Sequence, residues 1–465
     1  MKIGEIIKKE WLLIALVFVL AIGTRFIYFG YPKEIVFDEL YFAKFSTDYF
    51  KGTYYFDIHP PLAKLMMAGF AKVSGVNLPT TFDFKNISQT YPDNSYKLLR
   101  LFVSIFGVVL PLAVYYLSKQ LFRNKWPAFL AGLFTVFDNA LLVQSRFILM
   151  DVVLLAFGVL GLGFFLAHRR KRSFSWSWFA YLILSAIFLA AAFSVKWTAL
   201  IFFGLAGAII LFDVFRHKQI KDFIIKAIII GVVSFLFYFS VFAVHLKMLP
   251  KSGDGDAFMS ASFQKTLVGN QFYHDSNIKP AGLFRKFVEL NTVMYSANAG
   301  LTATHPYGSK WYSWPFLSRP IYYWYHDDGN NAASRIYLQG NPFIWWLGFI
   351  VVVYYALWCL AGLSKKNKKP EFWPIGLMIL GYLGNLVPYI FVSRVAFLYH
   401  YFPSLIFLIV LLGFFVWKYF KKYPLLIGVV ILITIVFFIF FAPLSYGLSL
   451  TEPIFNSKIW FRNWL

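Results

Sequence analysis

Long apolar stretches decide what this chain can fold into. A helix needs about 20 apolar residues to cross the hydrocarbon core of a bilayer, and the sequence holds eleven stretches that approach this length. They lie near residues 11–31, 98–121, 127–143, 152–167, 178–193, 198–213, 223–246, 343–363, 372–391, 402–417 and 425–445. Only 14% of the residues are charged, against about a quarter in a soluble domain. We therefore predict an all-α polytopic membrane protein with about eleven transmembrane helices.

Lysine and arginine residues gather in every second loop. The formal net charge is +23, from 44 Lys and Arg residues against 21 Asp and Glu residues. Under the positive-inside rule the basic loops are cytoplasmic, which predicts a cytoplasmic N-terminus, an outer C-terminus and a multi-pass protein of the plasma membrane. Topology and membrane lipid account for the charge, so we predict no nucleic-acid partner. The basic loops contain Lys2, Lys8 and Lys9; Lys119, Arg123 and Lys125; Arg169 to Arg172; Arg216, Lys218 and Lys221; Lys365, Lys366, Lys368 and Lys369; and Lys418, Lys421 and Lys422.

Two long segments lie outside the membrane in this topology. The first, residues 32–97, is expected to carry two interfacial helices, Leu40–Phe50 and Leu62–Val73, because each follows a helix start signal. The second, residues 247–342, is rich in Gly, Asn, Pro and aromatic residues, and we expect an irregular cap over a cavity. Residues 1–465 are predicted to form a single transmembrane domain.

Ionisable residues on the outer side point to a polar site there. Asp38 and Glu39 follow the first apolar stretch among apolar neighbours, where carboxylates are costly unless they are solvated or used. The alternative is an acidic helix start that the helix dipole favours. Four cations stand at outer helix ends, where snorkelling to lipid headgroups is the ordinary explanation for any one of them. Together they suggest a shared anionic ligand such as a lipid phosphate. The four are Arg100, Arg146, Lys196 and Arg394.

Two histidines stand beside prolines, which hold the local backbone rigidly. His59 opens the run His59-Pro60-Pro61, and His305 opens a run rich in aromatic residues that extends to Pro315. Aromatic faces there suit stacking on a sugar or an isoprenoid, although an interfacial aromatic belt gives the same pattern. A zinc site from Asp38, His59 and His305 lacks the spacing of zinc motifs. We therefore predict no bound metal and no certain cofactor, and leave the need for a divalent cation undecided.

Taken in order, these motifs resemble those of a known family. They resemble the protein O-mannosyltransferases, the dolichyl-phosphate-mannose–protein mannosyltransferases of the GT-C superfamily, over nearly the whole chain. Each motif is weak alone, but six in order at plausible spacing are specific. They are Phe37-Asp38-Glu39, His59-Pro60-Pro61-Leu62, Gln144-Ser145-Arg146 with Asp151, Val195-Lys196-Trp197, His305-Pro306-Tyr307 with Trp311 and Trp314-Pro315, and Tyr399-His400-Tyr401 with Pro403.

The resemblance implies a GT-C fold with an active site on the extracytoplasmic face. It implies a polyprenyl-phosphate-mannose donor, Ser or Thr hydroxyls of exported proteins as acceptors, and transfer with inversion. Eukaryotic members carry a MIR domain in the large external loop, and residues 247–342 are too few to hold one, so the chain looks like a bacterial-type member. Ala63 stands where Gly is common in the family, and Lys310 where Arg is frequent.

These inferences assign hypothetical roles to the residues. A carboxylate must accept the proton of the attacking hydroxyl, and Asp38 is the first choice, with Glu39 second. The donor phosphate is expected to dock among Arg100, Arg146, Lys196 and Arg394, whose charges stabilise the leaving group. Substrate positioning is expected from His59, Asp151, Trp197, His305, Tyr307, Lys310, Trp311, Tyr399 and His400.

Two other functions fit parts of the pattern. A GT-C transferase with a lipid or lipopolysaccharide acceptor, similar to the aminoarabinose transferases, would keep the fold and the donor class. A secondary transporter would place ionisable groups near the bilayer midplane and often shows repeats. Here the charges gather at outer helix ends and no repeat is visible, which favours the transferase.

Overall fold

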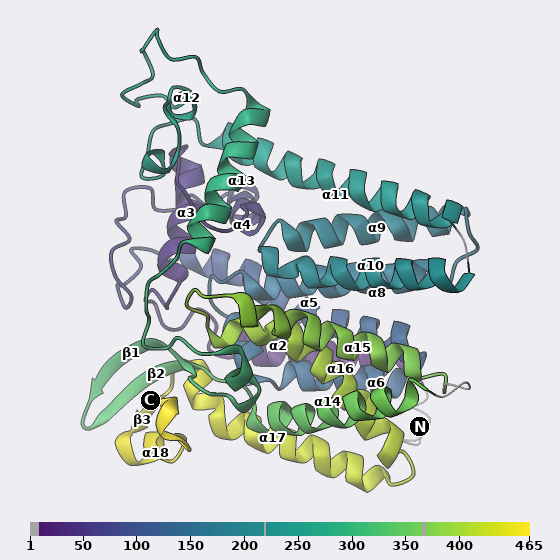
Figure 1. Ribbon diagram of the computed structural model, residues 1–465. Coiled ribbons are helices and arrows are strands. Elements are labelled where there is room, and N and C mark those ends of the chain that lie inside the picture. Colours follow the sequence, from purple (N-terminus) through teal and green to yellow (C-terminus); the bar gives the residue numbers. More distant parts are fainter. Residues whose placement is uncertain (1–8, 218–219, 365–368) are drawn as a thin grey trace.

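Helices that lie side by side in one bundle make up most of the molecule (Figure 1). The computed structural model describes residues 9–217, 220–364 and 369–465. Several basic residues of the sequence pattern, Lys2, Lys8, Lys218, Lys365, Lys366 and Lys368, lie outside the described residues.

Within the described ranges, nine helical segments are long and apolar enough to cross a membrane. All nine coincide with apolar stretches of the sequence. They are α5 (Ser95–Phe122), α8 (Asp151–His168), α9 (Trp176–Phe193), η1 with α10 (Trp197–Ala199, Leu200–His217), α11 (Ile220–Met248), α14 (Pro342–Gly362), α15 with η4 (Phe372–Leu386, Val387–Phe391), η5 with α16 (Leu398–Tyr401, Phe402–Phe420) and α17 (Pro424–Tyr446).

The other two apolar stretches are helical as well, but differ from simple spans. Helix α2 (Glu10–Phe26) has 17 residues, which is at the short end of what crosses a bilayer. The stretch at 127–143 is divided into α6 (Lys125–Val136) and α7 (Asn139–Gln144). Buried Asp138 causes the division, because its carboxylate accepts hydrogen bonds from the Leu141 amide at 2.9 Å and the Trp345 indole at 2.7 Å. The predicted all-α polytopic membrane fold is confirmed.

Helices α8 and α16 form the centre of the bundle, and nearly all of their side chains are buried. By contrast, α11 and α17 lie at the margins and expose most of their apolar surface (Figure 1), as helices that face lipid do. Helix α16 crosses α6 closely at Gly413, where an added Cβ would lie 2.8 Å from the Ala131 nitrogen.

Elements outside the spans gather at one end of the bundle (Figure 1). The predicted helices of the first external segment are present as α3 (Glu39–Lys51) and α4 (Leu62–Val73). The first and last described residues lie at opposite ends of the bundle (Figure 1), as an odd number of crossings requires. The remaining short elements are η2 (Asp256–Phe258), α12 (Ala261–Gln264), α13 (Leu283–Ala299), η3 (Trp311–Phe316), β1 (Ile321–Gly329), β2 (Ala332–Leu338), β3 (Ser449–Thr451), α18 (Glu452–Asn456) and η6 (Arg462–Trp464).

The expectation of an irregular cap at 247–342 is wrong for two of its parts. Helix α13 has 17 residues, and β1 and β2 form an antiparallel hairpin to which β3 adds a third strand. The hairpin turns at Asn330 and Asn331, whose φ angles are 52° and 61°. Asparagine tolerates this left-handed region, and a two-residue turn of this kind matches the twist of the paired strands.

Candidate active site

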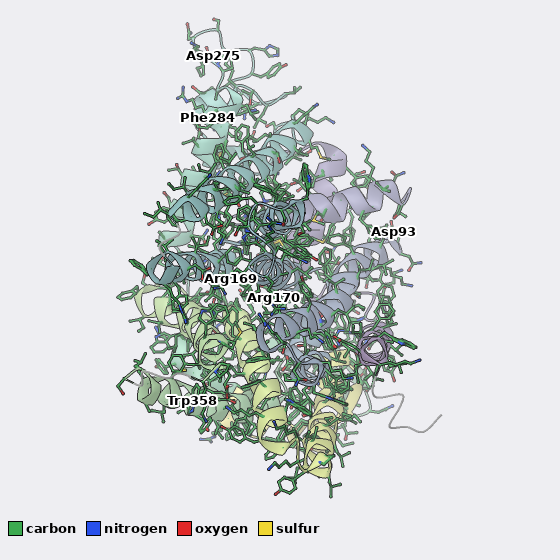
Figure 2. The ribbon with its side chains drawn as sticks, turned by 90° about the vertical axis from the view of Figure 1, so that its right-hand side faces the viewer. Asp93, Arg169, Arg170, Asp275, Phe284 and Trp358 are labelled. Carbon is green, nitrogen blue, oxygen red and sulfur yellow. The ribbon has the colours of Figure 1, made fainter. Side chains whose placement is uncertain are left out.

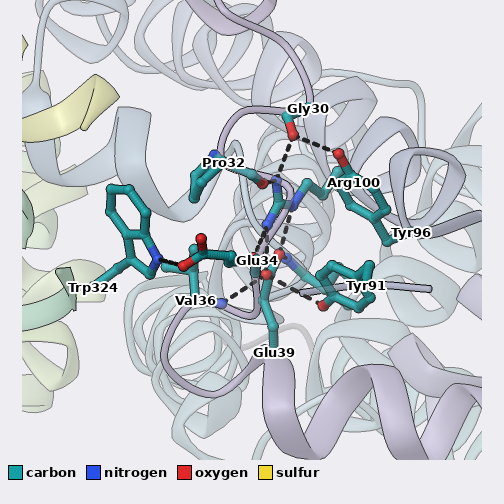
Figure 3. Close-up of polar contacts among 10 residues, drawn as sticks. Gly30, Pro32, Glu34, Val36, Glu39, Tyr91, Tyr96, Arg100 and Trp324 are labelled. Carbon is teal, nitrogen blue, oxygen red and sulfur yellow. Dashed lines mark hydrogen bonds and ion pairs between the residues drawn. The ribbon is translucent and has the colours of Figure 1, made fainter. Parts of the chain in front are cut away.

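The chain between α2 and α3 is held by a buried arginine of α5 (Figure 3). The Arg100 guanidinium donates hydrogen bonds to the carbonyls of Gly30 at 3.0 Å, Pro32 at 2.6 Å and Glu34 at 2.9 Å. Its Nε and Nη2 also donate to the two carboxylate oxygens of Glu39 at 2.8 and 2.7 Å. Neither side chain has any exposed surface. This fork fixes the segment that leads to Asp38.

Glu39 is saturated by protein donors. Besides Arg100, its carboxylate accepts hydrogen bonds from the amides of Val36 at 3.0 Å and Ile148 at 2.8 Å and from the Tyr91 hydroxyl at 3.3 Å. No oxygen is left for a substrate proton, and the site around it is closed to solvent. We therefore withdraw Glu39 as second choice for the base and Arg100 as a phosphate ligand.

Arg146 also holds backbone rather than facing a cavity. Its guanidinium donates to the carbonyls of Arg25 at 3.3 Å, Ile27, and Tyr28 at 2.8 Å, and lies 4.6 Å from the centre of the Tyr446 ring. Carbonyls at the end of a helix such as α2 lack partners within the helix, and Arg146 supplies them. With 3% of its surface exposed, Arg146 has no access to a phosphate, and we withdraw this prediction too.

The surroundings of the Asp38 carboxylate differ from those of Glu39. Phe37, just before it, has a φ of 50° and stacks on Tyr323 with ring centres 4.1 Å apart, so the tertiary fold stabilises a backbone conformation that costs about 1–2 kcal/mol. Asp38 begins α3 with a half-buried carboxylate that has no hydrogen bond or ion pair to any described residue. Burial raises the pKa of the Asp38 carboxyl to about 7, while the Lys196 ammonium lowers it and the carboxylates of Asp151 and Asp57 raise it.

A cavity of about 120 Å³ collects residues from distant parts of the chain. At its wall the Lys196 ammonium donates to both oxygens of Asp151, at 3.0 and 2.9 Å, and lies 5.1 Å from the centre of the Tyr399 ring. Since Lys196 and Asp151 both act on the pKa of Asp38, that carboxyl lies near this cavity. The lining side chains of the sequence pattern are His59, Asp151, Lys196, Arg394, Tyr399 and His400.

A second cavity, of about 280 Å³, adjoins the first at Arg394, which lines both. The Arg394 guanidinium donates a hydrogen bond from Nη1 to the Asn298 side-chain oxygen at 2.8 Å, and it forms no ion pair with a carboxylate of the described residues. The second cavity also takes in His305, Lys310 and Trp311. The structure thus brings together residues that lie more than 300 positions apart in the chain.

Comparison with known proteins identifies the family. The family model described as dolichyl-phosphate-mannose-protein mannosyltransferase matches residues 15–250, half of the chain. A second model, the C-terminal four TMM region of protein-O-mannosyltransferase, matches residues 283–464. The chain belongs to the dolichyl-phosphate-mannose-protein mannosyltransferase family.

Individual members of this family show the same likeness. Protein O-mannosyltransferase 1 of Drosophila melanogaster is 34% identical over 262 residues, which cover 54% of this chain and 29% of that protein. Dolichyl-phosphate-mannose–protein mannosyltransferase 4 of Schizosaccharomyces pombe is 30% identical over 350 residues, which cover 72% of this chain and 42% of that protein. The chain spans less than half the length of these curated relatives.

A solved structure confirms the GT-C fold. The structure of the S. cerevisiae protein O-mannosyltransferase Pmt1-Pmt2 complex bound to the sugar donor contains a chain that matches with a TM-score of 0.90 at 20% identity. The match covers 98% of this chain and 92% of that one. At this identity the likeness concerns the course of the chain rather than its chemistry.

Two residues named from the family motifs stand back from both cavities. The Trp197 indole donates a hydrogen bond to the Tyr238 hydroxyl at 3.0 Å, and the Tyr307 ring packs near His305 and Tyr322. Neither is among the residues that line the two cavities.

Sequence reasoning missed the ion pair of Asp57 and Lys64 next to His59. The Lys64 ammonium donates to Asp57, whose other oxygen accepts from the His59 amide at 3.3 Å. Burial, together with the cations of Lys196, Lys64 and Arg394, holds the pKa of His59 well below its usual range, so its imidazole is neutral at pH 7. The signal was present, since Asp57 precedes the motif by two residues in a chain poor in acids.

The described residues contain no cluster of three or more His, Cys, Asp or Glu side chains that could hold a metal ion.

The buried fork predicts that Arg100→Met destabilises the protein. Removing one partner leaves the Glu39 carboxylate buried without its counter-ion, which costs about 3–5 kcal/mol. We expect a clearly lower unfolding temperature in detergent, whereas Arg462→Met, at an exposed position near the C-terminus, should leave it unchanged. An Arg100→Met protein of wild-type stability with weaker donor binding would restore Arg100 to the phosphate site.

Proposed function

We propose that the chain transfers mannose from a polyprenyl-phosphate-mannose donor to Ser or Thr hydroxyls of exported proteins, with inversion at the anomeric carbon. Membership of the mannosyltransferase family supports the reaction class. The observation that carries the proposal is the Asp38 carboxylate, which has no partner among the described residues and lies near a cavity lined by cations.

Asp38 is proposed as the base. The other carboxylates around it are occupied, since Glu39 pairs with Arg100 and Asp151 with Lys196. A pKa of about 7 suits a general base at neutral pH, because the group is both ionised and basic enough to take a proton. In the proposed step the acceptor hydroxyl oxygen bonds to the anomeric carbon and its proton passes to Asp38. The bond from that carbon to the phosphate oxygen breaks, and the phosphate leaves with the electron pair.

Arg394 and Lys196 are proposed to bind the donor phosphate. Arg394 retains guanidinium donors beyond its bond to Asn298, and planar guanidinium groups match phosphate oxygens in pairs. Lys196 already forms an ion pair with Asp151, so it acts on the phosphate mainly through the electric field of its fixed positive charge. Positive charge fixed beside the leaving oxygen stabilises the negative charge that develops there.

Histidine, aromatic and lysine side chains are proposed to position the substrates. Neutral His59 and the ring of Tyr399 stand beside the phosphate-binding cations in the first cavity, together with His400. The second cavity brings Trp311, His305 and Lys310 together with Arg394. Trp197 and Tyr307 are proposed to support these walls from behind.

We also infer the orientation and the division of the chain. The candidate site opens at the end that carries α3, α4 and the hairpin, whereas Arg169 and Arg170 follow α8 at the other end. By the positive-inside rule, the basic end is cytoplasmic and the site faces outward from the plasma membrane. Residues 32–97 then supply the acidic motif and 247–342 cap the site, within one domain spanning 1–465.

An assay with purified protein tests the reaction. Incubation with polyprenyl-phosphate mannose and a Ser/Thr-rich peptide should yield mannosylated peptide, and a peptide added to right-side-out vesicles should be modified while one added to inverted vesicles is not. If a lipid acceptor is mannosylated and the peptide is not, the acceptor is a lipid rather than a protein. Uptake of substrate into sealed vesicles without sugar transfer would overturn the transferase proposal.

The raised pKa of Asp38 predicts a pH profile. Because the base must be ionised and its pKa is about 7, kcat/KM should fall about tenfold for each pH unit below that value and level off above it. Asp38→Asn should reduce turnover by roughly 10²–10⁴-fold at an unchanged unfolding temperature. Asp83→Asn, at an exposed position, is the matched control. A flat profile, or a substantially active Asp38→Asn, would assign the proton to another group.

The phosphate proposal predicts a defect in donor binding for Arg394→Gln. Loss of a charge-assisted contact of about 1.5–3 kcal/mol should raise the donor KM roughly 10-fold to 100-fold, with little change in the peptide KM. Arg462→Gln removes a positive charge at the same end of the molecule without touching either cavity. An unchanged donor KM in Arg394→Gln would remove this residue from the site.

A further inference from the structure

A basic pocket of about 680 Å³ lies at the end of the bundle opposite the candidate active site. Helix α8 links the two ends, since it begins at Asp151 and its 18 residues span about 27 Å. Figure 2 faces this end, with Arg169 and Arg170 labelled near its centre. The charged residues of the lining are Arg123, Arg169, Arg170, Lys418 and Lys421, against the single carboxylate of Glu371.

Within the described part of the chain, two of the five cations are neutralised by carboxylates. Arg169 pairs with Asp213 of α10, with Nε 2.9 Å from Oδ2, and Lys418 pairs with Glu371 at 2.8 Å. Arg170 instead donates to the side-chain and backbone oxygens of Gln120, which carry no charge.

The remaining cations crowd one another. Arg123 and Lys421 form no ion pair with any described residue. Burial and the neighbouring cations of Arg123 and Arg169 lower the pKa of Arg170. Like charges held together in a pocket raise the free energy of the empty state, and a bound anion relieves that repulsion.

A groove of about 950 Å³ between α10 and α15 adjoins the basic pocket, and its lining is apolar apart from Arg216 and Lys369. Pro370 and Trp373 border both spaces, and the Trp373 ring lies 4.7 Å from the guanidinium carbon of Arg169. Phe212 and Leu380 line the groove with 40% and 49% of their surfaces exposed. The groove therefore runs along lipid-facing helices from the edge of the basic pocket toward the interior of the bilayer.

We propose that this end of the protein binds an anionic membrane phospholipid, with its phosphate headgroup in the basic pocket and an acyl chain in the groove between α10 and α15. The charge of the pocket selects an anionic over a zwitterionic headgroup, because three cations there have no carboxylate partner in the described ranges. Basic pockets between transmembrane helices recognise anionic headgroups in this way. The apolar groove selects a lipid over a free phosphate, since a soluble anion would leave its apolar wall uncovered.

Two double variants with equal loss of charge test the proposal. Arg123→Gln/Lys421→Gln removes two cations that line the pocket, and Arg172→Gln/Lys422→Gln removes two cations from loops at the same end of the bundle that do not line it. The intact protein would be placed in phosphatidylcholine nanodiscs with increasing phosphatidylglycerol, and bound phosphatidylglycerol measured by native mass spectrometry. At about 1 kcal/mol per cation, the first variant should lose roughly 10-fold to 30-fold in apparent affinity, and the second less than about threefold.

Three results would overturn this assignment. Equal losses in the two double variants would show that phosphatidylglycerol responds only to the overall surface charge, and no loss in either would show that it does not bind through these cations. Displacement of the bound lipid by soluble glycerol phosphate at comparable concentration would show that the pocket takes a free phosphate and that the groove contributes nothing. Unfolding temperatures of both variants in phosphatidylcholine alone should match the wild type, which separates lipid binding from folding.

Discussion

The contact between buried arginines and backbone carbonyls is the constraint on which the candidate site depends. Where α2 ends, its last carbonyls and those of the following loop have neither a helix nor bulk water to pair with. Arg146 takes those of the helix end and Arg100 those of the loop. Arg25 does the same in return, with bonds to Val136 at 2.8 Å and Thr135 at 3.2 Å at the end of α6. The path of the chain into Asp38 is thereby fixed from three sides.

That constraint explains how two adjacent carboxylates come to differ. The Glu39 carboxylate faces the Arg100 guanidinium and balances its positive charge. Asp38, one residue earlier, follows the left-handed Phe37 and is left without a protein partner. One carboxylate is buried in an ion pair and held by hydrogen bonds, and the other has a pKa raised to about 7. The environments of the two groups, rather than their identities, separate a structural from a proposed catalytic role.

Much of this could be predicted from the sequence, because the membrane imposes simple rules. Apolar length and the alternation of basic loops gave the helices and their order, and the scarcity of acids drew attention to Asp38. The partners of Arg100 and Arg146 could not be predicted in the same way. A cation at a helix end looks the same whether it faces a phosphate or a carbonyl, and these carbonyls lie 66 to 121 positions away in the chain.

Two other features of the fold, the hairpin and the break between α6 and α7, have signals in the sequence. Gly329-Asn330-Asn331 between aromatic strands marks a hairpin turn, and Asp138 inside an apolar stretch marks the break between α6 and α7. At Asp138 the cap signal was outweighed by the stronger pattern of apolar length, whereas at the hairpin the composition of residues 247–342, rich in Gly, Asn and Pro, favoured an irregular segment. The length of a stretch predicts that it crosses the membrane, but not whether it does so as one unbroken helix.

The net charge of +23 has a structural meaning beyond topology. The positive-inside rule explains why cations gather on one side, but it does not require them to line a pocket or to lack carboxylate partners. Several do pair, as Arg169 with Asp213 and Lys418 with Glu371, and these pairs brace helix ends. Some of the cations without a carboxylate partner among the described residues line cavities: Arg394 at one end of the bundle, and Arg123, Arg170 and Lys421 at the other. Since unpaired charge in a concave site concentrates anions, the excess is distributed as two lipid phosphates on opposite faces of a membrane would require.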